Sequence, residues 1–205
     1  MSLLSVYCAD IGSIKSGKFG WAREDSAGST EAGTDISDLV RVLAVDLQAG
    51  TRVALGFECP LYVPISDDPV DLTSQRRIDM GKPWSAGAGP AVLATGLTET
   101  VWILERLRKQ LGSPPPAFLD WSSFGQSERG LFLWEAMVTG EAKGASHQED
   151  AAIAVGAFRT WALEARADEN STVESVHSLI GAALLRAGWS DDISLLRKPC
   201  LVVRA

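Results

Sequence analysis

The chain has 205 residues, of which 46% are hydrophobic and 22% charged, a composition typical of one globular α/β domain. It contains no apolar stretch of about 20 residues, the length that a membrane-spanning helix requires. Its net charge of −7 argues against tight non-specific binding to nucleic acid, because the overall field repels phosphate.

The first sixty residues predict the order β-β-β-α-β. Apolar runs at 5–10 and 53–58 are typical of buried strands. Residues 19–23 and 28–34 predict two further strands, the first of which forms a hairpin with strand 5–10. A helix is predicted between 36 and 47, where apolar residues recur on one helical face. A helix that connects two strands in this way lets strand 53–58 lie parallel beside strand 5–10.

The remaining elements complete an α/β fold. An irregular stretch and a predicted helix at 91–111 together form an insertion at about 60–112. The other predicted elements are strands at 117–121, 131–135 and 201–203 and helices at 151–165 and 173–187. We therefore expect a single domain over 1–205, with a mixed sheet flanked by helices on both faces.

Three of the apolar runs end in an acidic residue, and these residues are Asp10, Glu58 and Glu135. In open α/β sheets, ligands bind at the carboxyl ends of the strands. Carboxylates that converge there repel one another unless a cation lies between them. Carboxylate oxygens with few histidines suit a hard ion, so the pattern predicts a site for Mg²⁺ or Mn²⁺.

The predicted helix 173–187 offers two more ligands. Glu174 and His177 are three residues apart and lie about 60° from each other around a helix, where they can face the carboxyl ends of the strands. The sequence thus predicts Asp10, Glu58, Glu174 and His177 as metal ligands, with Glu135 also in the catalytic group.

With these features, the chain resembles an uncharacterised family of predicted nucleases with the ribonuclease H-like fold. The resemblance covers most of the chain and rests on five short motifs. They are Asp10-Ile-Gly12-Ser-Ile-Lys-Ser-Gly17-Lys-Phe-Gly20-Trp21, Glu58-Cys59-Pro60, Arg76-Arg77-Ile78-Asp79, Leu133-Trp134-Glu135 and Glu174-Ser-Val-His177-Ser-Leu-Ile-Gly-Ala182-Ala183. Two positions depart from the family pattern: Glu58 stands where the family more often has Asp, and His177 replaces one of two closing acids. Asp150 is a competing candidate for that closing acid.

The resemblance implies a nuclease that hydrolyses phosphodiester bonds with divalent metal ions. Three or four carboxylates can hold two such ions about 3.5–4 Å apart, which suits in-line displacement at phosphorus. Nucleic acid is then the expected substrate, bound through a local basic patch. The candidates for phosphate contact are Lys15, Lys18, Arg76, Arg77 and Lys82. We expect no membrane partner, and the sequence leaves a homodimer open.

Two alternatives remain open. The Asp10 turn also resembles the first phosphate loop of the sugar kinase and actin superfamily, which would make the protein a phosphotransferase or an ATP-binding protein. The replacement by His177 and the acidic charge are also compatible with a degenerate, non-catalytic binding or structural protein. The three cysteines lack metal-ligand spacing, and the first residues do not resemble a secretion signal, so we expect a cytoplasmic protein.

Overall fold

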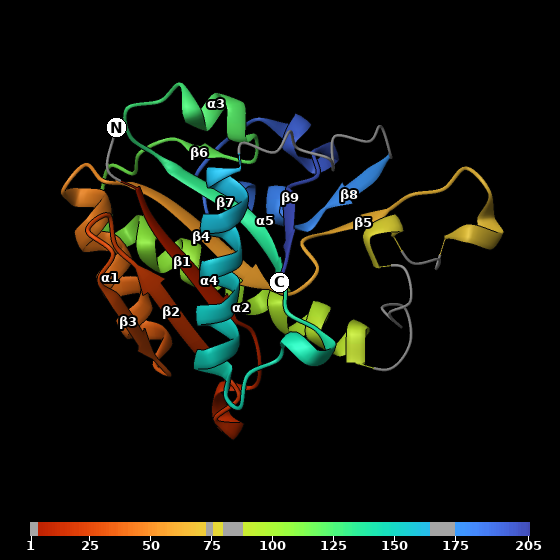
Figure 1. The fold of residues 1–205 in the computed structure, drawn as a ribbon. Helices are drawn as coiled ribbons and strands as arrows, with labels where there is room; N and C mark the ends of the chain where they lie inside the picture. The colour runs from red at the N-terminus through yellow and green to blue at the C-terminus, as the bar shows by residue number, and fades with distance from the viewer. Residues whose placement is uncertain (1–3, 73–75, 80–87, 165–174) are drawn as a thin grey trace.

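The computed structural model describes residues 4–72, 76–79, 88–164 and 175–205. Its main sheet has seven strands: β1 Leu4–Asp10, β2 Gly20–Glu24, β3 Thr30–Gly33, β4 Arg52–Glu58, β6 Ala117–Phe118, β7 Leu131–Met137 and β9 Leu201–Arg204. The strand order is β3-β2-β1-β4-β7-β6, and β9 also pairs with β7 (Figure 1). The sheet is mixed, because β2 and β3 are antiparallel to their neighbours and the other pairs are parallel.

The central prediction of adjacent, parallel strands is confirmed. β1 pairs with β4 in parallel along its whole length, and the register places Asp10 beside Glu58. β7 lies on the other side of β4, so the strands that carry the three predicted acids are neighbours. All three are nearly continuous apolar runs, as expected for strands with helices on both faces.

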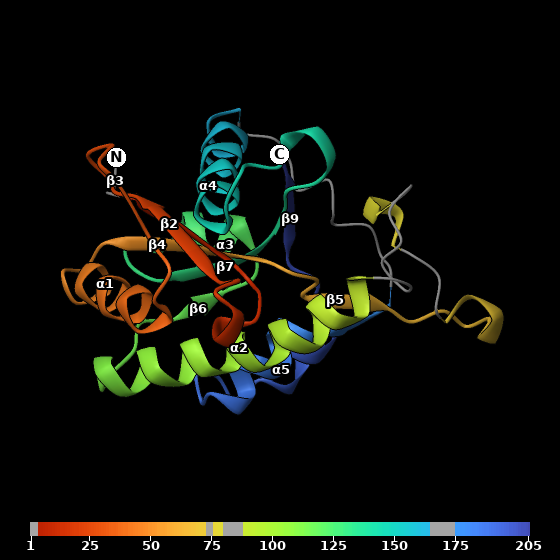
Figure 2. The same cartoon turned by 90° about the horizontal axis from the view of Figure 1, so that it is seen from below.

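Five α-helices accompany the sheet within the described residues: α1 Ile36–Gln48, α2 Ala88–Leu111, α3 Trp121–Gly125, α4 His147–Leu163 and α5 Leu179–Arg186. Figure 2 shows α4 on one side of the sheet and α2 and α5 on the other. The predicted apolar faces of α1 and α4 are buried. The described helices include none that is long and apolar enough to cross a membrane. The protein is thus α/β with helices on both faces of a mixed sheet.

Side chains of successive strand residues alternate between two hydrophobic cores. Cys8 and Trp134 belong to the core under α4, whereas Tyr7, Leu55 and Leu133 belong to the core under α1, α2 and α5. This alternation decides which acids at the strand ends can meet.

The predicted helix 173–187 is wrong at its start. Residues 173 and 174 lie outside the described part, and Val176–Ser178 forms a strand, β8, that pairs with β5, Tyr62–Pro64. α5 begins after Ser178, whose side chain accepts a hydrogen bond from Gly181 N and so caps the helix.

The predicted strand 117–121 is also shorter than expected. β6 has two residues, and the Asp120 side chain then accepts from Ser123 N to start α3. Short 3₁₀ segments lie at Ile14–Ser16, Pro69–Asp71, Arg77–Asp79, Gly140–Ala142 and Ile193–Arg197.

Candidate metal site

Asp10 and Glu58 meet at the carboxyl ends of β1 and β4. They are direct register partners, and both side chains point to the α4 side of the sheet. Both are largely withdrawn from solvent, with Asp10 4% exposed. The two carboxyl groups are joined by a hydrogen bond, so one of them carries a proton.

Asp150, in the first turn of α4, completes the group. One carboxylate oxygen from each of Asp10, Glu58 and Asp150 lies within 4.8 Å of the others. We call these three residues the acidic cluster. Gly20, the register partner of Asp10, permits this approach, because a Cβ at that position would collide with the backbone of His147 and Gln148. The amino end of α4 can therefore lie directly on β2.

Two basic side chains contact the acidic cluster. Lys143 Nζ lies 3.1 Å from Asp150 Oδ2 and 3.5 Å from Glu58 Oε1. His147 Nδ1 lies 2.5 Å from Asp10 Oδ2. The other Asp150 oxygen, Oδ1, accepts from Gly144 N at 2.7 Å. The loop before α4 thus contributes both an ammonium group and a backbone donor.

The pKa values of the strand acids are shifted upward. Burial raises the pKa of Asp10 to about 6, although the hydrogen bond with Glu58 and the charge of Lys143 act in the opposite direction. Burial, followed by the hydrogen bond and charge of Asp10, raises the pKa of Glu58 to about 8. Near neutral pH the pair therefore holds one proton, because burial disfavours the ionised form of both carboxyl groups and the charge of Lys143 offsets this only in part.

Glu99 on α2 is a fourth acid that the sequence analysis missed. It is 8% exposed and accepts a hydrogen bond from Gly12 N, in the turn that follows Asp10. Its Oε2 atom is buried without a hydrogen-bond partner among the described residues. Burial raises the pKa of Glu99 to about 7, and its charge raises that of Asp10. Glu99 lies four residues before the buried Ile103, so both side chains lie on the same face of α2. This spacing was the signal in the sequence that the carboxyl group of Glu99 lies on the apolar face of the helix.

Glu135 does not join the acidic cluster, which corrects the prediction from its place at the end of an apolar run. The register sets Glu135 beside Phe57 rather than Glu58, so its side chain points to the opposite face of the sheet. There Arg76 Nη2 and Nη1 contact its two oxygens at 2.6 and 2.7 Å. Arg76 Nε also contacts Asp79 at 2.6 Å. We call Arg76, Asp79 and Glu135 the arginine cluster.

The closing acid predicted in the last helix is also placed differently. His177 lies on β8 with an exposed side chain, since it is the middle residue of a short strand rather than part of a buried helical face. Glu174 lies outside the described residues. Asp150, the competing candidate, lies where the prediction put Glu174 or His177. Its signal was a first-turn acid following Ser146, whose side chain caps α4.

The predicted phosphate contacts divide into three groups. Lys15 and Lys18 are exposed in the turn that follows β1, near the acidic cluster in the chain. Arg76 is 2% exposed and held in the arginine cluster, so it is not available to a substrate. The side chain of Arg77 and all of Lys82 lie outside the described part of the chain.

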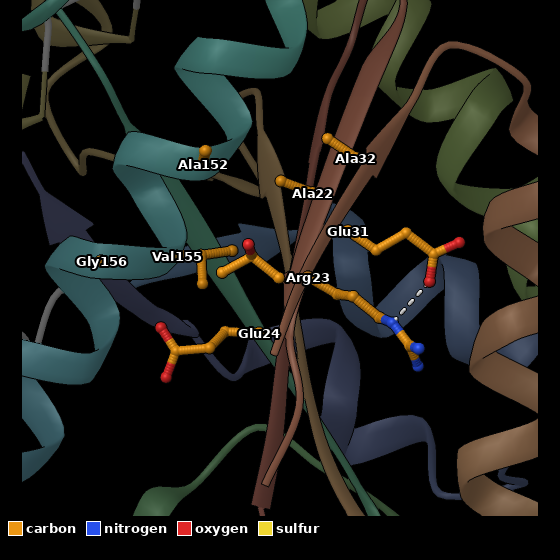
Figure 3. A pocket seen from close by; sticks show the side chains of 9 residues that line it. Ala22, Arg23, Glu24, Glu31, Ala32, Ala152, Val155 and Gly156 are labelled. Atoms are coloured by element: carbon orange, nitrogen blue, oxygen red, sulfur yellow. Dashed lines mark ion pairs between the residues drawn. The ribbon is translucent and has the colours of Figure 1, made fainter. Parts of the chain in front are cut away.

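A separate groove lies between α4 and the β2–β3 edge of the sheet (Figure 3). Small side chains line it, among them Ala22, Ala32 and Ala152. On its rim, Arg23 pairs with Glu31, with 2.9 Å between Nε and Oε2. The groove includes no residue of the acidic cluster, so it does not extend the candidate site.

Comparisons with protein-family models, curated proteins and solved structures found no match to this chain. The function proposed below is therefore inferred from the geometry of the acidic cluster and from the chemistry of its side chains.

Proposed function

We propose that the protein is a divalent-metal-dependent phosphodiester hydrolase, a nuclease of the ribonuclease H-like type. The observation that carries this proposal is the acidic cluster, in which three carboxylates from β1, β4 and α4 converge at the carboxyl edge of the sheet. The order β1, β2, β3, α1, β4, with β4 parallel to β1, also supports the ribonuclease H-like assignment.

The donor set fits Mg²⁺ or Mn²⁺. The cluster offers oxygen ligands only, as hard divalent ions prefer. Burial raises the pKa values of Asp10 and Glu58 despite the nearby charge of Lys143, and one buried oxygen of Glu99 has no hydrogen-bond partner among the described residues. A bound cation would therefore stabilise the ionised form of these acids. Bound ions would supply the Lewis acidity and the positive charge that hydrolysis of a phosphodiester needs.

The chain's own residues have separate tasks in this proposal. Asp10 and Glu58 are held rigidly by the parallel strand pair, and Asp150 is oriented by Gly144 N, which leaves its Oδ2 as the ligand atom. Lys15 and Lys18, in the turn after β1, attract the phosphate backbone of the substrate.

Replacing Asp10 by Asn tests the proposal. The substitution keeps the shape and removes one ligand charge. We expect cleavage of single- and double-stranded DNA, RNA or hybrid duplex in Mn²⁺ to fall about 100-fold or more, equivalent to a loss of about 2.7 kcal/mol in transition-state stabilisation. The metal-free variant should melt at the same temperature or higher, because one repelling charge is gone. Asp38→Asn, on the exposed surface of α1, is the matched control and should cleave normally.

Lys143 favours a second candidate, a non-catalytic protein in which the ammonium group permanently takes the place of a metal. Its Nζ already contacts two of the three carboxylates. Calorimetry distinguishes the candidates. If wild-type protein binds no Mn²⁺ and cleaves nothing above the Asp10→Asn background, the non-catalytic candidate is correct.

A further inference from the structure

We propose that Lys143 exchanges partners during the reaction. Without metal its ammonium group neutralises the acidic cluster, and with metal bound it contacts a phosphate group of the substrate. This inference rests on the proposed function and extends it, because it assigns a substrate-binding role to a residue that the sequence analysis did not select.

Lys143 and a metal ion compete for the same oxygen atoms. Its Nζ lies 3.1 Å from Asp150 Oδ2 and 3.5 Å from Glu58 Oε1. The remaining Asp150 oxygen is occupied by Gly144 N, so Oδ2 is the atom left for a metal. An ammonium group and a divalent cation repel each other strongly at such short separations. Metal binding therefore requires Lys143 Nζ to leave.

The side chain of Lys143 can leave without disturbing the site. It is 50% exposed, and a lysine carries its charge on a flexible stem of four carbons. The backbone beside it packs closely against the first turn of α4. Gly144 N donates to Asp150, and a Cβ at Gly144 would lie 2.5 Å from the Glu149 Cβ. The loop thus holds its position while the ammonium group moves.

A phosphate group is the natural new partner for this ammonium. The protein carries a net charge of −7, so an anionic substrate needs local cations beside the metal. Arg76 is fully engaged on the opposite face of the sheet. Lys143 is the described cation that contacts two carboxylates of the cluster, and the released Nζ stays within a side-chain length of it.

The first experiment measures Mn²⁺ affinity by calorimetry for wild type, Lys143→Met and Lys143→Arg. Lys109→Met, at the far end of α2, is the matched control. Removing the competing charge should tighten Mn²⁺ binding by Lys143→Met about 3- to 10-fold, since ligand charge sets affinity at such sites. Lys143→Arg and Lys109→Met should bind Mn²⁺ like wild type. Circular dichroism checks that each variant folds.

A thermal measurement gives a second readout. Lys143→Met should melt below wild type without metal, and the difference should disappear at saturating Mn²⁺, where wild-type Lys143 no longer contacts the carboxylates. Equal Mn²⁺ affinities of wild type and Lys143→Met would overturn the proposed competition.

The third readout is the salt dependence of KM for a single-stranded DNA oligonucleotide in saturating Mn²⁺. Loss of one phosphate contact should lower the slope of log KM against log salt by about 0.7 in Lys143→Met but not in Lys109→Met. An unchanged slope overturns the phosphate contact even if Mn²⁺ binds more tightly. If wild type binds no Mn²⁺ but Lys143→Met does, the proposed function fails together with the exchange, and Lys143 is a permanent counter-ion.

Discussion

The carboxyl edge of the sheet carries two buried groups of acids, one on each face. The arginine cluster faces α5 and the small β5–β8 sheet, and the acidic cluster faces α4. Both contain a carboxylate from the carboxyl-terminal part of a parallel strand, and the acids of both are largely withdrawn from water. Their partners differ. Glu135 receives a bidentate guanidinium contact and a hydrogen bond from Leu61 N, whereas Asp10 and Glu58 share a proton beside a half-exposed lysine.

This difference shows how a structural ion pair is distinguished from a candidate metal site. The acids are largely buried in both clusters, so burial alone does not indicate function. In the arginine cluster the two acids raise the pKa of Arg76 above its ordinary value although burial lowers it, and both carboxylates contact the guanidinium directly. In the acidic cluster burial is the main cause of the raised pKa values of Asp10 and Glu58, and the charge of Lys143 does not offset it.

The largest expected effect is on the arginine cluster. Arg76→Met removes the guanidinium that the buried carboxylates of Glu135 and Asp79 both contact, so the free energy of unfolding should fall by about 3–5 kcal/mol. Urea denaturation measures this loss. The double variant Arg76→Met with Glu135→Leu should recover part of it. A loss below about 1 kcal/mol for Arg76→Met would show that the arginine cluster does not stabilise the fold as a structural ion pair.

The acidic cluster should give the metal-free protein an unusual pH dependence. The folded-state pKa values of Asp10 and Glu58, about 6 and 8, lie above their ordinary values, so the folded state binds protons more tightly than the unfolded state. Stability is then greatest near pH 4–5 and falls as pH rises through 6 and 8, by about 2–4 kcal/mol.

Urea denaturation between pH 5 and 8 measures this dependence. Glu99→Gln removes the contribution of Glu99, whose pKa is about 7, and also lowers the pKa of Asp10, because a repelling charge is gone. The slope that remains belongs to the acidic cluster. Saturating Mn²⁺ should reverse the trend, because the proton must leave before the metal binds. If the stability of the metal-free protein instead rises with pH over this range, Asp10 and Glu58 do not share a proton in the folded state.

A smaller effect distinguishes the candidates for the closing acid. Asp150→Asn should weaken Mn²⁺ binding about 10-fold, because it removes one charged ligand of three. His177→Ala should change it less than about twofold, since the side chain is exposed on β8 and such surface changes have small effects. Calorimetry on both variants and on Glu174→Gln measures the contrast. Weaker binding in His177→Ala than in Asp150→Asn would restore the prediction made from the sequence.

The sequence by itself determined the strands that carry Asp10 and Glu58, their parallel pairing and the apolar face of α1. These features depend on local periodicity and on the handedness of a β-α-β connection, both of which are readable along the chain. The sequence also identified the carboxyl edge of β1 and β4 as the place where acids converge.

Only the tertiary structure decided which further residues join them. Glu135 ends an apolar run as Asp10 and Glu58 do, but the register between β4 and β7 turns it to the other face. Asp150 and Lys143 reach the cluster because α4 packs directly over Gly20, a contact between residues more than a hundred positions apart. Strand register and helix placement are set by packing across the whole fold, and a shift of one residue reverses the direction of every side chain.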